Sequence, residues 1–273
     1  MRKYFVCLIA VLLSISSANA QYVMKVTMKN GDVSEFNVSE IEDVTWQDKN
    51  AISDITGGEH NGHEYVDLGL SVMWATCNVG ASTPEEYGSH YAWGETKPYG
   101  ESDTSNSTNY NYAGTYTKTY YNWKTYKWCN GSSSNLTKYC TDSDLGALDN
   151  KTILEPSDDV AQVEWGGRWR MPTDKEWKEL LEECTWAMCT TQDGKIGYKV
   201  TSKTNGNSII LLAAGYHNYD SLYNDGKVGY YWSSSLNTGS PSYAYYVSFN
   251  SSVDGKSDFC DRYHGQSVRP VCQ

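Results

Sequence analysis

The fold is decided by residues 165–177, which read WGGRWRMPTDKEW. Pro172 has no backbone N–H and is expected to end a strand. Thr173 and Glu176 have the spacing of a capping box, in which each side chain bonds the backbone N–H of the other residue. A helix is therefore predicted over Asp174–Glu183, with apolar side chains at the i, i+3, i+4 and i+7 positions of one buried face. That face consists of Trp177, Leu180, Leu181 and Cys184.

The C-terminal part of the chain alternates apolar segments with polar, tyrosine-rich ones. The chain has 23 Tyr against 4 Phe, and nine of the tyrosines lie between Tyr216 and Tyr263. Tyrosine offers a flat surface and a hydroxyl at low entropic cost, and Ser, Gly and Asn add adaptable hydrogen bonds. This composition predicts a ligand-binding face over residues 215–265. Strands are predicted at 209–213, 230–233, 244–249 and 268–271, and loops at 217–224, 237–243 and 250–265.

Loops on a rigid framework usually gather on one surface, so the candidate contact residues are predicted to cluster and to be largely exposed. Phe259 is the most informative of them, because an exposed phenylalanine is unfavourable unless it meets a partner. The candidate ligand-binding residues are His217, Tyr219, Asp220, Tyr223, Tyr243, Asp254, Ser257, Asp258, Phe259, Asp261, Tyr263 and His264.

The first 20 residues have the pattern of a secretory signal peptide. Arg2 and Lys3 form the charged start, an apolar run follows over residues 4–15, and Ala18-Asn19-Ala20 matches a cleavage site. The apolar run is too short to span a membrane. The protein is therefore predicted to be exported, to the periplasm, the cell surface or the extracellular space, with no transmembrane segment.

The charge balance bears on the partner. Cleavage removes Arg2 and Lys3 and lowers the Lys and Arg count from 22 to 20, against 33 Asp and Glu, which gives a net charge of −13. Such a surface repels phosphate backbones, so nucleic acid is excluded as a partner. The expected ligand is an unknown protein or glycan, and the oligomeric state stays open.

The N-terminal region of the exported chain carries a hairpin signal. Two alternating runs, Val23–Met28 and Val33–Val38, flank Asn30-Gly31, a dipeptide that favours the type I′ turn of a β-hairpin. A third strand is predicted at residues 41–46. The predicted organisation is a signal peptide (1–20), a small β-hairpin module (21–50), a linker (51–64) and a main domain (65–273) with a polar insertion (98–140).

No catalytic motif is found in the sequence. His60 and His63 are the one pair of histidines at metal-binding spacing, and they lie in the predicted linker. Five aspartates of the candidate face offer calcium ligands without the order of an EF-hand, so a structural calcium ion stays open and no other cofactor or metal is expected. These aspartates are Asp220, Asp225, Asp254, Asp258 and Asp261.

Several phrases of the sequence resemble domains of one fold. Residues 165–177 resemble the strand–Arg-Leu-Pro-Thr-x-x-Glu-Trp–helix signature of formylglycine-generating-enzyme-like domains, a branch of the C-type lectin fold. Residues 65–75 (YVDLGLSVMWA) resemble the opening of the Fibrobacter succinogenes major paralogous (FISUMP) type of domain, found in secreted Bacteroidota proteins. Residues 232–235 (WSSS) and 267–272 (SVRPVC) resemble its closing strands. The resemblance covers the main domain and implies an α+β, C-type lectin-like fold after the hairpin module.

The sequence departs from the enzymes of this branch. They carry a copper-binding cysteine pair near the C-terminus with four residues between its members. Here eleven residues separate Cys260 and Cys272, and the pair with four, Cys184 and Cys189, follows the helix. The Glu-Pro-Asn and Trp-Asn-Asp triplets of sugar-binding lectins are absent too. We therefore expect a non-catalytic receptor- or adhesin-like protein. A formylglycine-generating or other enzyme and a structural surface subunit are the alternatives.

The C-terminal segment also resembles the target protein of a diversity-generating retroelement, whose terminal codons are randomised at template adenines. Asparagine codons treated in this way reach Tyr, Ser, Asp, Gly, His, Arg, Cys, Phe and Val. From Asn250 to His264, every residue except Lys256 belongs to the reachable set. The resemblance implies that residues 215–265 form a variable face; the alternative is an ordinary polar loop.

Seven of the eight cysteines remain after cleavage, and export favours disulfides with at least one thiol left over. Zinc is the competing interpretation, but Cys184 and Cys189 lack a second ligand pair. Lectin-like domains bring their first and last strands together, and this resemblance implies a bridge between Cys77 and Cys272. The other predicted bridges are Cys184–Cys189 and Cys129–Cys140, which leaves Cys260 unpaired.

Overall fold

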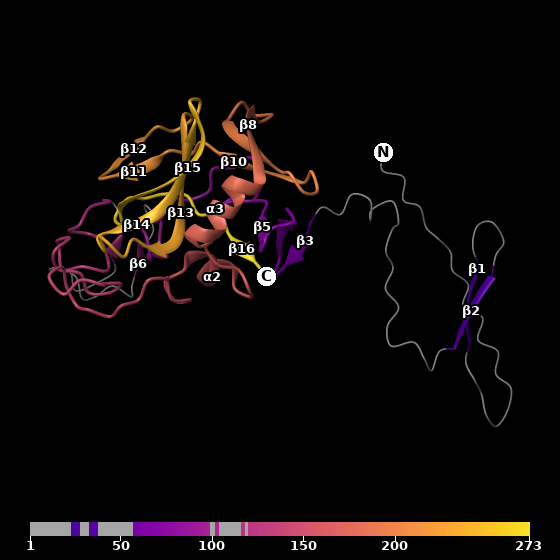
Figure 1. Ribbon diagram of the computed structural model, residues 1–273, viewed down its shortest axis with the longest axis horizontal. Coiled ribbons are helices and arrows are strands. Elements are labelled where there is room, and N and C mark those ends of the chain that lie inside the picture. Colours follow the sequence, from indigo (N-terminus) through magenta and orange to yellow (C-terminus); the bar gives the residue numbers. More distant parts are fainter. Residues whose placement is uncertain (1–22, 28–32, 38–56, 99–101, 104–115, 118–119) are drawn as a thin grey trace, which may run out of the picture. The chain divides into compact units, whose positions relative to one another are not determined.

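The computed structural model of the chain describes residues 23–27, 33–37, 57–98, 102–103, 116–117 and 120–273. It divides into two compact units, Met1–Ile55 and Thr56–Gln273. The described part is mostly β-sheet with small helices (Figure 1), which is compatible with the predicted α+β class. The predicted signal peptide, residues 1–20, lies outside the described residues.

The first unit contains an antiparallel hairpin. Its strands are β1 (Val23–Thr27) and β2 (Val33–Asn37), with Thr27 opposite Val33. They lie within the two runs whose alternation predicts strands. Lys25 and Glu35 are opposite each other and form an exposed ion pair at 2.5 Å. The predicted turn at residues 30–31 and the predicted strand at 41–46 lie outside the described residues.

A second hairpin opens the larger unit, where a linker is predicted. β3 (Gly57–His60) and β4 (His63–Val66) pair around Asn61 and Gly62, which have φ angles of 50° and 82°. Both angles lie in the left-handed region that a type I′ turn requires. The hairpin joins β5 (Met73–Ala75) and β16 (Val271–Cys272) in a sheet of order β16-β5-β4-β3. The linker prediction is therefore wrong for residues 57–64.

The capping box forms as predicted. Helix α3 spans Asp174–Glu183, with the Thr173 hydroxyl accepting from the Glu176 N–H at 3.3 Å and the Glu176 carboxylate accepting from the Thr173 N–H at 2.7 Å. Trp177 is buried and donates its indole N–H to the Trp232 carbonyl at 3.1 Å. A shorter helix, α2 (Val160–Trp165), precedes α3 in a stretch where no helix is predicted.

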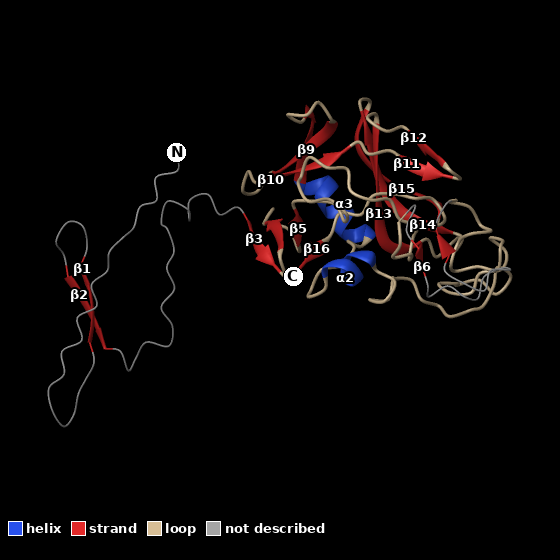
Figure 2. Cartoon of the chain, turned by 180° about the vertical axis from the view of Figure 1, so that it is seen from behind, coloured by secondary structure: helices blue, strands red, loops and turns tan. Residues whose placement is uncertain are grey.

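Helix α3 lies between two three-stranded sheets (Figure 2). One sheet contains β8 (Cys184–Thr190), β9 (Ile196–Ser202) and β10 (Ser208–Leu212). The other contains β13 (Val228–Leu236), β14 (Tyr243–Asn250) and β15 (Val253–Asp261), with β15 at its edge. Two further hairpins are formed by β11 (Tyr216–Asn218) with β12 (Ser221–Tyr223), and by β6 (Ser102–Asp103) with β7 (Tyr116–Thr117).

The predicted strands and loops compare unevenly with these elements. The strands predicted at 209–213, 230–233 and 244–249 coincide largely with β10, β13 and β14, whereas only Val271 of the segment 268–271 lies in a strand. The loops predicted at 217–224 and 250–265 are wrong over β11, β12 and β15. These three strands are polar and lack the apolar alternation by which a strand is recognised in a sequence. They form because they pair with neighbouring strands.

The polar insertion is fastened to the rest of the unit by a buried arginine. Arg262, just after β15, is fully buried and donates from Nη1 to the Tyr139 carbonyl at 2.8 Å. Its guanidinium lies 5.4 Å from the ring centre of Trp93 and 5.2 Å from that of Tyr126. Its backbone N–H donates to the Ser242 carbonyl at 3.1 Å. A neighbouring apolar cluster of the insertion consists of Tyr121, Tyr126, Cys129, Leu136 and Cys140.

The seven cysteines of the larger unit are all free thiols, so none of the three predicted disulfides is formed. Cys184 and Cys189 lie on the same strand, β8. Five residues of extended chain separate Cα atoms by about 17 Å, whereas a disulfide needs about 4.4–6.8 Å. The same geometry prevents these two thiols from forming a copper-binding pair like that of the formylglycine-generating enzymes.

The cysteines of the other two predicted disulfides make non-covalent contacts instead. The thiol of Cys129 donates to the Trp123 carbonyl at 3.0 Å, and that of Cys140 donates to the Asp142 carbonyl at 3.0 Å. Both thiols therefore act as donors in a buried part of the insertion. Cys77 and Cys272 pack as small apolar side chains in one core cluster, which explains their burial without a covalent bond.

Candidate functional site

Aromatic side chains of β11 to β14 and of the two residues 263–264 after β15 form a continuous group on one part of the larger unit. Tyr216 is at its centre, with ring centroids 5.6 Å from Tyr223, 4.8 Å from Tyr230 and 5.3 Å from His264. Tyr230 continues to Tyr246 at 5.9 Å, and His264 continues to Tyr263 at 4.6 Å. Each of these side chains is half-buried or exposed. We call this group the tyrosine face; it consists of Tyr216, Tyr223, Tyr230, Tyr246, Tyr263 and His264.

Burial keeps the groups of the tyrosine face uncharged. It lowers the pKa of His264 to about 4 and raises the pKa values of the Tyr246 and Tyr263 hydroxyls above their ordinary range. It also raises the pKa of the neighbouring Cys260 thiol, which accepts from Gln266 Nε2 at 3.0 Å. At neutral pH the face therefore presents hydroxyls and an imidazole that both donate and accept hydrogen bonds.

The hairpin of β11 and β12 is held from both sides. The backbone of His217 exchanges two hydrogen bonds with Gly265, at 2.7 and 2.9 Å. The backbone of Tyr219 exchanges two with Tyr121 of the insertion, both at 2.9 Å. The strand β11, which carries Tyr216, is thus held between the insertion and the segment that follows β15. The tyrosine face is therefore organised before a ligand binds.

Tyr219 occupies a strained position at the tip of this hairpin. Its φ angle is 55°, in the left-handed region, and its side chain is 54% exposed. A tyrosine in that region costs about 1 kcal/mol or more, and strained residues are concentrated at functional sites. The hairpin therefore holds a large aromatic side chain outward at a position where glycine or asparagine would be more stable.

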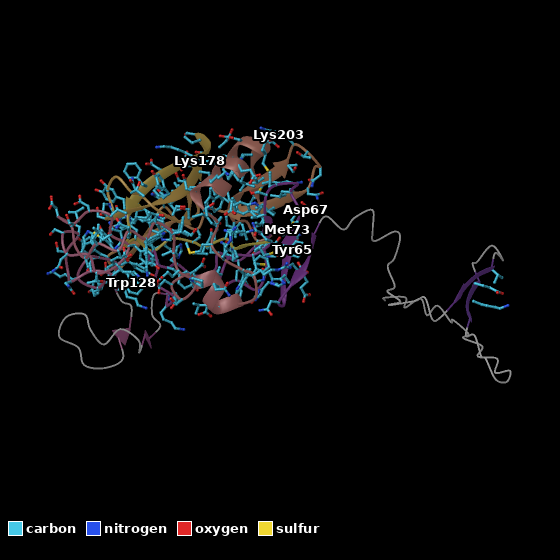
Figure 3. The ribbon with its side chains drawn as sticks, turned by 60° about the horizontal axis from the view of Figure 1, so that its bottom comes forward. Tyr65, Asp67, Met73, Trp128, Lys178 and Lys203 are labelled. Carbon is cyan, nitrogen blue, oxygen red and sulfur yellow. The ribbon has the colours of Figure 1, made fainter. Side chains whose placement is uncertain are left out.

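A second aromatic group lies on the edge strand β15. Phe259 is 46% exposed, and its ring is 5.7 Å from that of Tyr243 and 6.1 Å from that of Tyr245. Lys178 of α3 lies 5.5 Å from the Tyr245 ring centre and pairs with Asp174 at 2.6 Å. Figure 3 shows Lys178 at the outer edge of the larger unit. Phe259 is exposed as predicted, and its aromatic neighbours are Tyr243 and Tyr245.

The twelve candidate residues therefore form two aromatic groups with separate residues around them. None of the twelve is fully buried. The exposed ones are Tyr219, Asp220, Tyr223, Asp254 and Phe259; the half-buried ones are His217, Tyr243, Ser257, Asp258, Asp261, Tyr263 and His264. Asp258 is paired with Lys256 at 2.5 Å, and Ser257 donates to Asp174 at 2.7 Å.

Four tyrosines of these groups are missing from the sequence-based set: Tyr216, Tyr230, Tyr245 and Tyr246. Tyr230, Tyr245 and Tyr246 lie on segments predicted as scaffold strands, whereas Tyr216 lies on β11, between the strand predicted at 209–213 and the loop predicted at 217–224. The period-2 alternation of strands could have found two of them, because Tyr230 and Trp232 lie on one face of β13 and are opposite Ser248 and Tyr246 of β14.

The described residues form neither a metal site nor a membrane-spanning helix. Within residues 57–98 and 120–273 and the short described segments, no three His, Cys, Asp or Glu side chains come together as a metal site. His60 and His63 have other contacts: His60 Nε2 accepts from the Arg168 N–H at 2.9 Å, and His63 stacks on Trp165. No helix in the described part of the chain is long and apolar enough to cross a membrane.

Comparisons with known proteins give no relative. No family model matches the chain, no curated protein matches it, and no solved structure matches it. The function is therefore argued from the tyrosine face and its surroundings.

Proposed function

We propose that this protein is an exported, non-catalytic binding protein on a C-type lectin-like scaffold of the FISUMP type. Its tyrosine face binds a protein or glycan ligand. The observation that carries the proposal is the uninterrupted series of partly exposed aromatic rings on β11 to β14 and just after β15. Rings with hydroxyls bind large partners well, since they combine apolar contact area with hydrogen bonding and lose little rotamer freedom.

The first test uses the strained residue Tyr219. The Tyr219→Asn substitution removes the exposed ring and places at φ 55° a residue that tolerates the left-handed region. We expect ligand binding to fall by roughly tenfold or more, while the free energy of unfolding stays equal or rises by up to about 1 kcal/mol. Binding is measured for hits from glycan and secreted-protein arrays probed with residues 21–273, and stability by urea unfolding.

Val163→Ala is the matched control. Val163 is 47% exposed on α2, a helix that carries no residue of the tyrosine face. Its substitution should leave both readouts unchanged. Unaltered binding of every array ligand by Tyr219→Asn, or a clear loss of stability in that variant, would remove Tyr219 from the binding surface.

We also propose that the segment 215–265, which carries the tyrosine face, is diversified in part by a retroelement. The neighbouring DNA provides the test: a near-copy of the 3′ coding end that differs only at adenines, beside a reverse-transcriptase gene, is expected. We expect the differing codons to map to exposed positions such as Tyr219, Asp254 and Phe259. A neighbourhood without such a copy would return residues 250–265 to an ordinary surface hairpin.

A further inference from the structure

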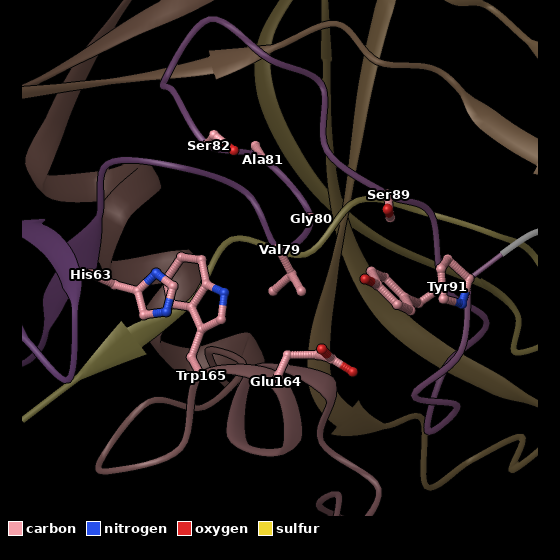
Figure 4. A pocket seen from close by; sticks show the side chains of 10 residues that line it. His63, Val79, Gly80, Ala81, Ser82, Ser89, Tyr91, Glu164 and Trp165 are labelled. Carbon is pink, nitrogen blue, oxygen red and sulfur yellow. The ribbon is translucent and has the colours of Figure 1, made fainter. Parts of the chain in front are cut away.

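A pocket of about 430 Å³ lies between β4, the loop that follows β5, and α2 (Figure 4). Its lining residues Ser89 and Tyr91 flank His90, whose ring is 5.1 Å from that of His217 on β11. The pocket shares no residue with the tyrosine face or with the aromatic group on β15. It is therefore a separate candidate site.

One wall of the pocket is rigid because two rings stack. His63 of β4 lies parallel to Trp165 of α2, with centroids 3.8 Å apart and an interplanar angle of 6°. Asn61, in the turn of the β3–β4 hairpin, donates to the Trp165 carbonyl and fixes the end of α2 against that hairpin. Burial lowers the pKa of His63, so its imidazole is neutral at pH 7 and offers one donor and one acceptor.

The opposite wall is held by a close approach of backbone and side chain. Gly80 has a φ angle of 81°, and a Cβ atom there would lie 2.5 Å from the Ser89 hydroxyl. The Ser89 N–H donates to the Val79 carbonyl at 3.0 Å, and the Val79 N–H donates to Val268 at 3.0 Å. These bonds join the floor of the pocket to the core, so the cavity is preformed.

The charged side chain among the lining residues is a carboxylate. The Glu164 carboxylate lies between Val79 and Tyr91 in Figure 4, and its ion pair with Lys97 is long, at 3.7 Å. Ser82 and Ser89 add hydroxyls at the rim, and Val79 and Tyr91 form a buried floor. A carboxylate with two hydroxyls above an apolar floor matches a ligand with several O–H donors and a face of C–H groups.

We infer that this pocket binds a neutral saccharide of one or two rings. Vicinal hydroxyls of a sugar would donate to the Glu164 carboxylate, which accepts two such bonds. The C–H face of the sugar would cover Val79 and the outer side of the His63 imidazole. The net charge of −13 of residues 21–273 disfavours acidic sugars. The inference does not depend on the tyrosine face.

The test is NMR saturation transfer and calorimetric titration of residues 21–273 with glucose, galactose, mannose and N-acetylglucosamine. At least one of them is expected to bind saturably with a dissociation constant in the millimolar range. Ethanolamine is the cationic probe, because a carboxylate pocket could also take an amine. Binding of none of the sugars, or of ethanolamine in their place, would overturn the inference.

Single substitutions test whether the sugar binds in this pocket. Glu164→Gln keeps the shape and removes the charge, and it should weaken the sugar by about tenfold because hydrogen bonds to a charged group are the stronger ones. Ala81→Trp fills the pocket from the rim and should abolish binding. Val163→Ala, next to Glu164 on α2 but not lining the pocket, should bind as the parent does. Unchanged affinity in both Glu164→Gln and Ala81→Trp would place the sugar elsewhere.

Discussion

Replacing Arg269 by alanine is expected to lower the free energy of unfolding by at least about 4 kcal/mol. The side chain is fully buried, and its guanidinium donates to the Asn78 side chain and to the carbonyls of Ala75, Thr76 and Ile210, at 2.9 Å each. All four acceptors are neutral. Truncation therefore leaves several buried oxygens without donors and opens a cavity beside the strands that close the domain.

Two variants make this prediction specific. Arg269→Lys should recover only part of the loss, since one ammonium group cannot reach acceptors spread around a planar guanidinium. Arg168→Ala removes an exposed arginine of the same region and should change stability by less than about 0.5 kcal/mol. Urea unfolding of the three variants decides the matter: a loss below about 1 kcal/mol for Arg269→Ala would show that the carbonyl cluster does not need the cation.

Acid is expected to destabilise the protein through His90. This side chain is buried, and burial with the neighbouring His217 lowers its pKa from 6.5 to about 4, although hydrogen bonds to the backbone of Gly215 and Ala214 act in the other direction. As the pH falls below about 6.5, the imidazole of His90 therefore becomes protonated in the unfolded chain but stays neutral in the folded chain. The folded state loses stability as the pH falls from 6.5 towards 4, by about 3 kcal/mol in all for this one group.

The contribution of His90 has to be measured as a difference between two proteins, because the protonation of Asp159 changes the stability in the opposite direction. Burial raises the pKa of that carboxyl to about 6, so it takes up a proton in the folded state first and stabilises the fold as the pH falls. The comparison is therefore between the wild type and His90→Asn, by urea unfolding from pH 7 to pH 4. The wild type should lose about 3 kcal/mol more than the variant. Parallel curves would mean that His90 titrates normally in the fold.

The helix bounds could be predicted from the sequence because the capping box is a local signal. The two hydrogen bonds of the capping box join Thr173 and Glu176, which are close in sequence, and need no residue from another part of the chain. The second hairpin also had a local signal, Asn61-Gly62 between two short runs, but Gly57-Gly58 and the polar flanks favoured a linker instead. Here the tertiary pairing of β4 with β5 decides the structure.

The tyrosine face could be predicted only in part. Composition located the region, and Tyr219, Tyr223 and Phe259 are exposed within it. The division into two aromatic groups could not be foreseen, because β15 is a polar strand whose place is set by its register with β14, Tyr245 opposite Phe259. The disulfide predictions failed for a similar reason: cysteine spacing carries no information on whether Cys184 and Cys189 lie on a turn or on one extended strand.

The burial of Arg262 has a consequence at the level of the gene. The residue lies among the codons that adenine-directed randomisation would reach, yet its guanidinium holds the carbonyls of the insertion from a fully buried position. Random substitution at position 262 would leave most variants of the protein unable to fold, independently of the sequence of their binding surface. Arginine has six codons, and only those of the form CGT, CGC or CGG contain no adenine. A diversified lineage is therefore constrained to one of these three at position 262, so that synonymous codon choice protects the interior while the surface around it changes.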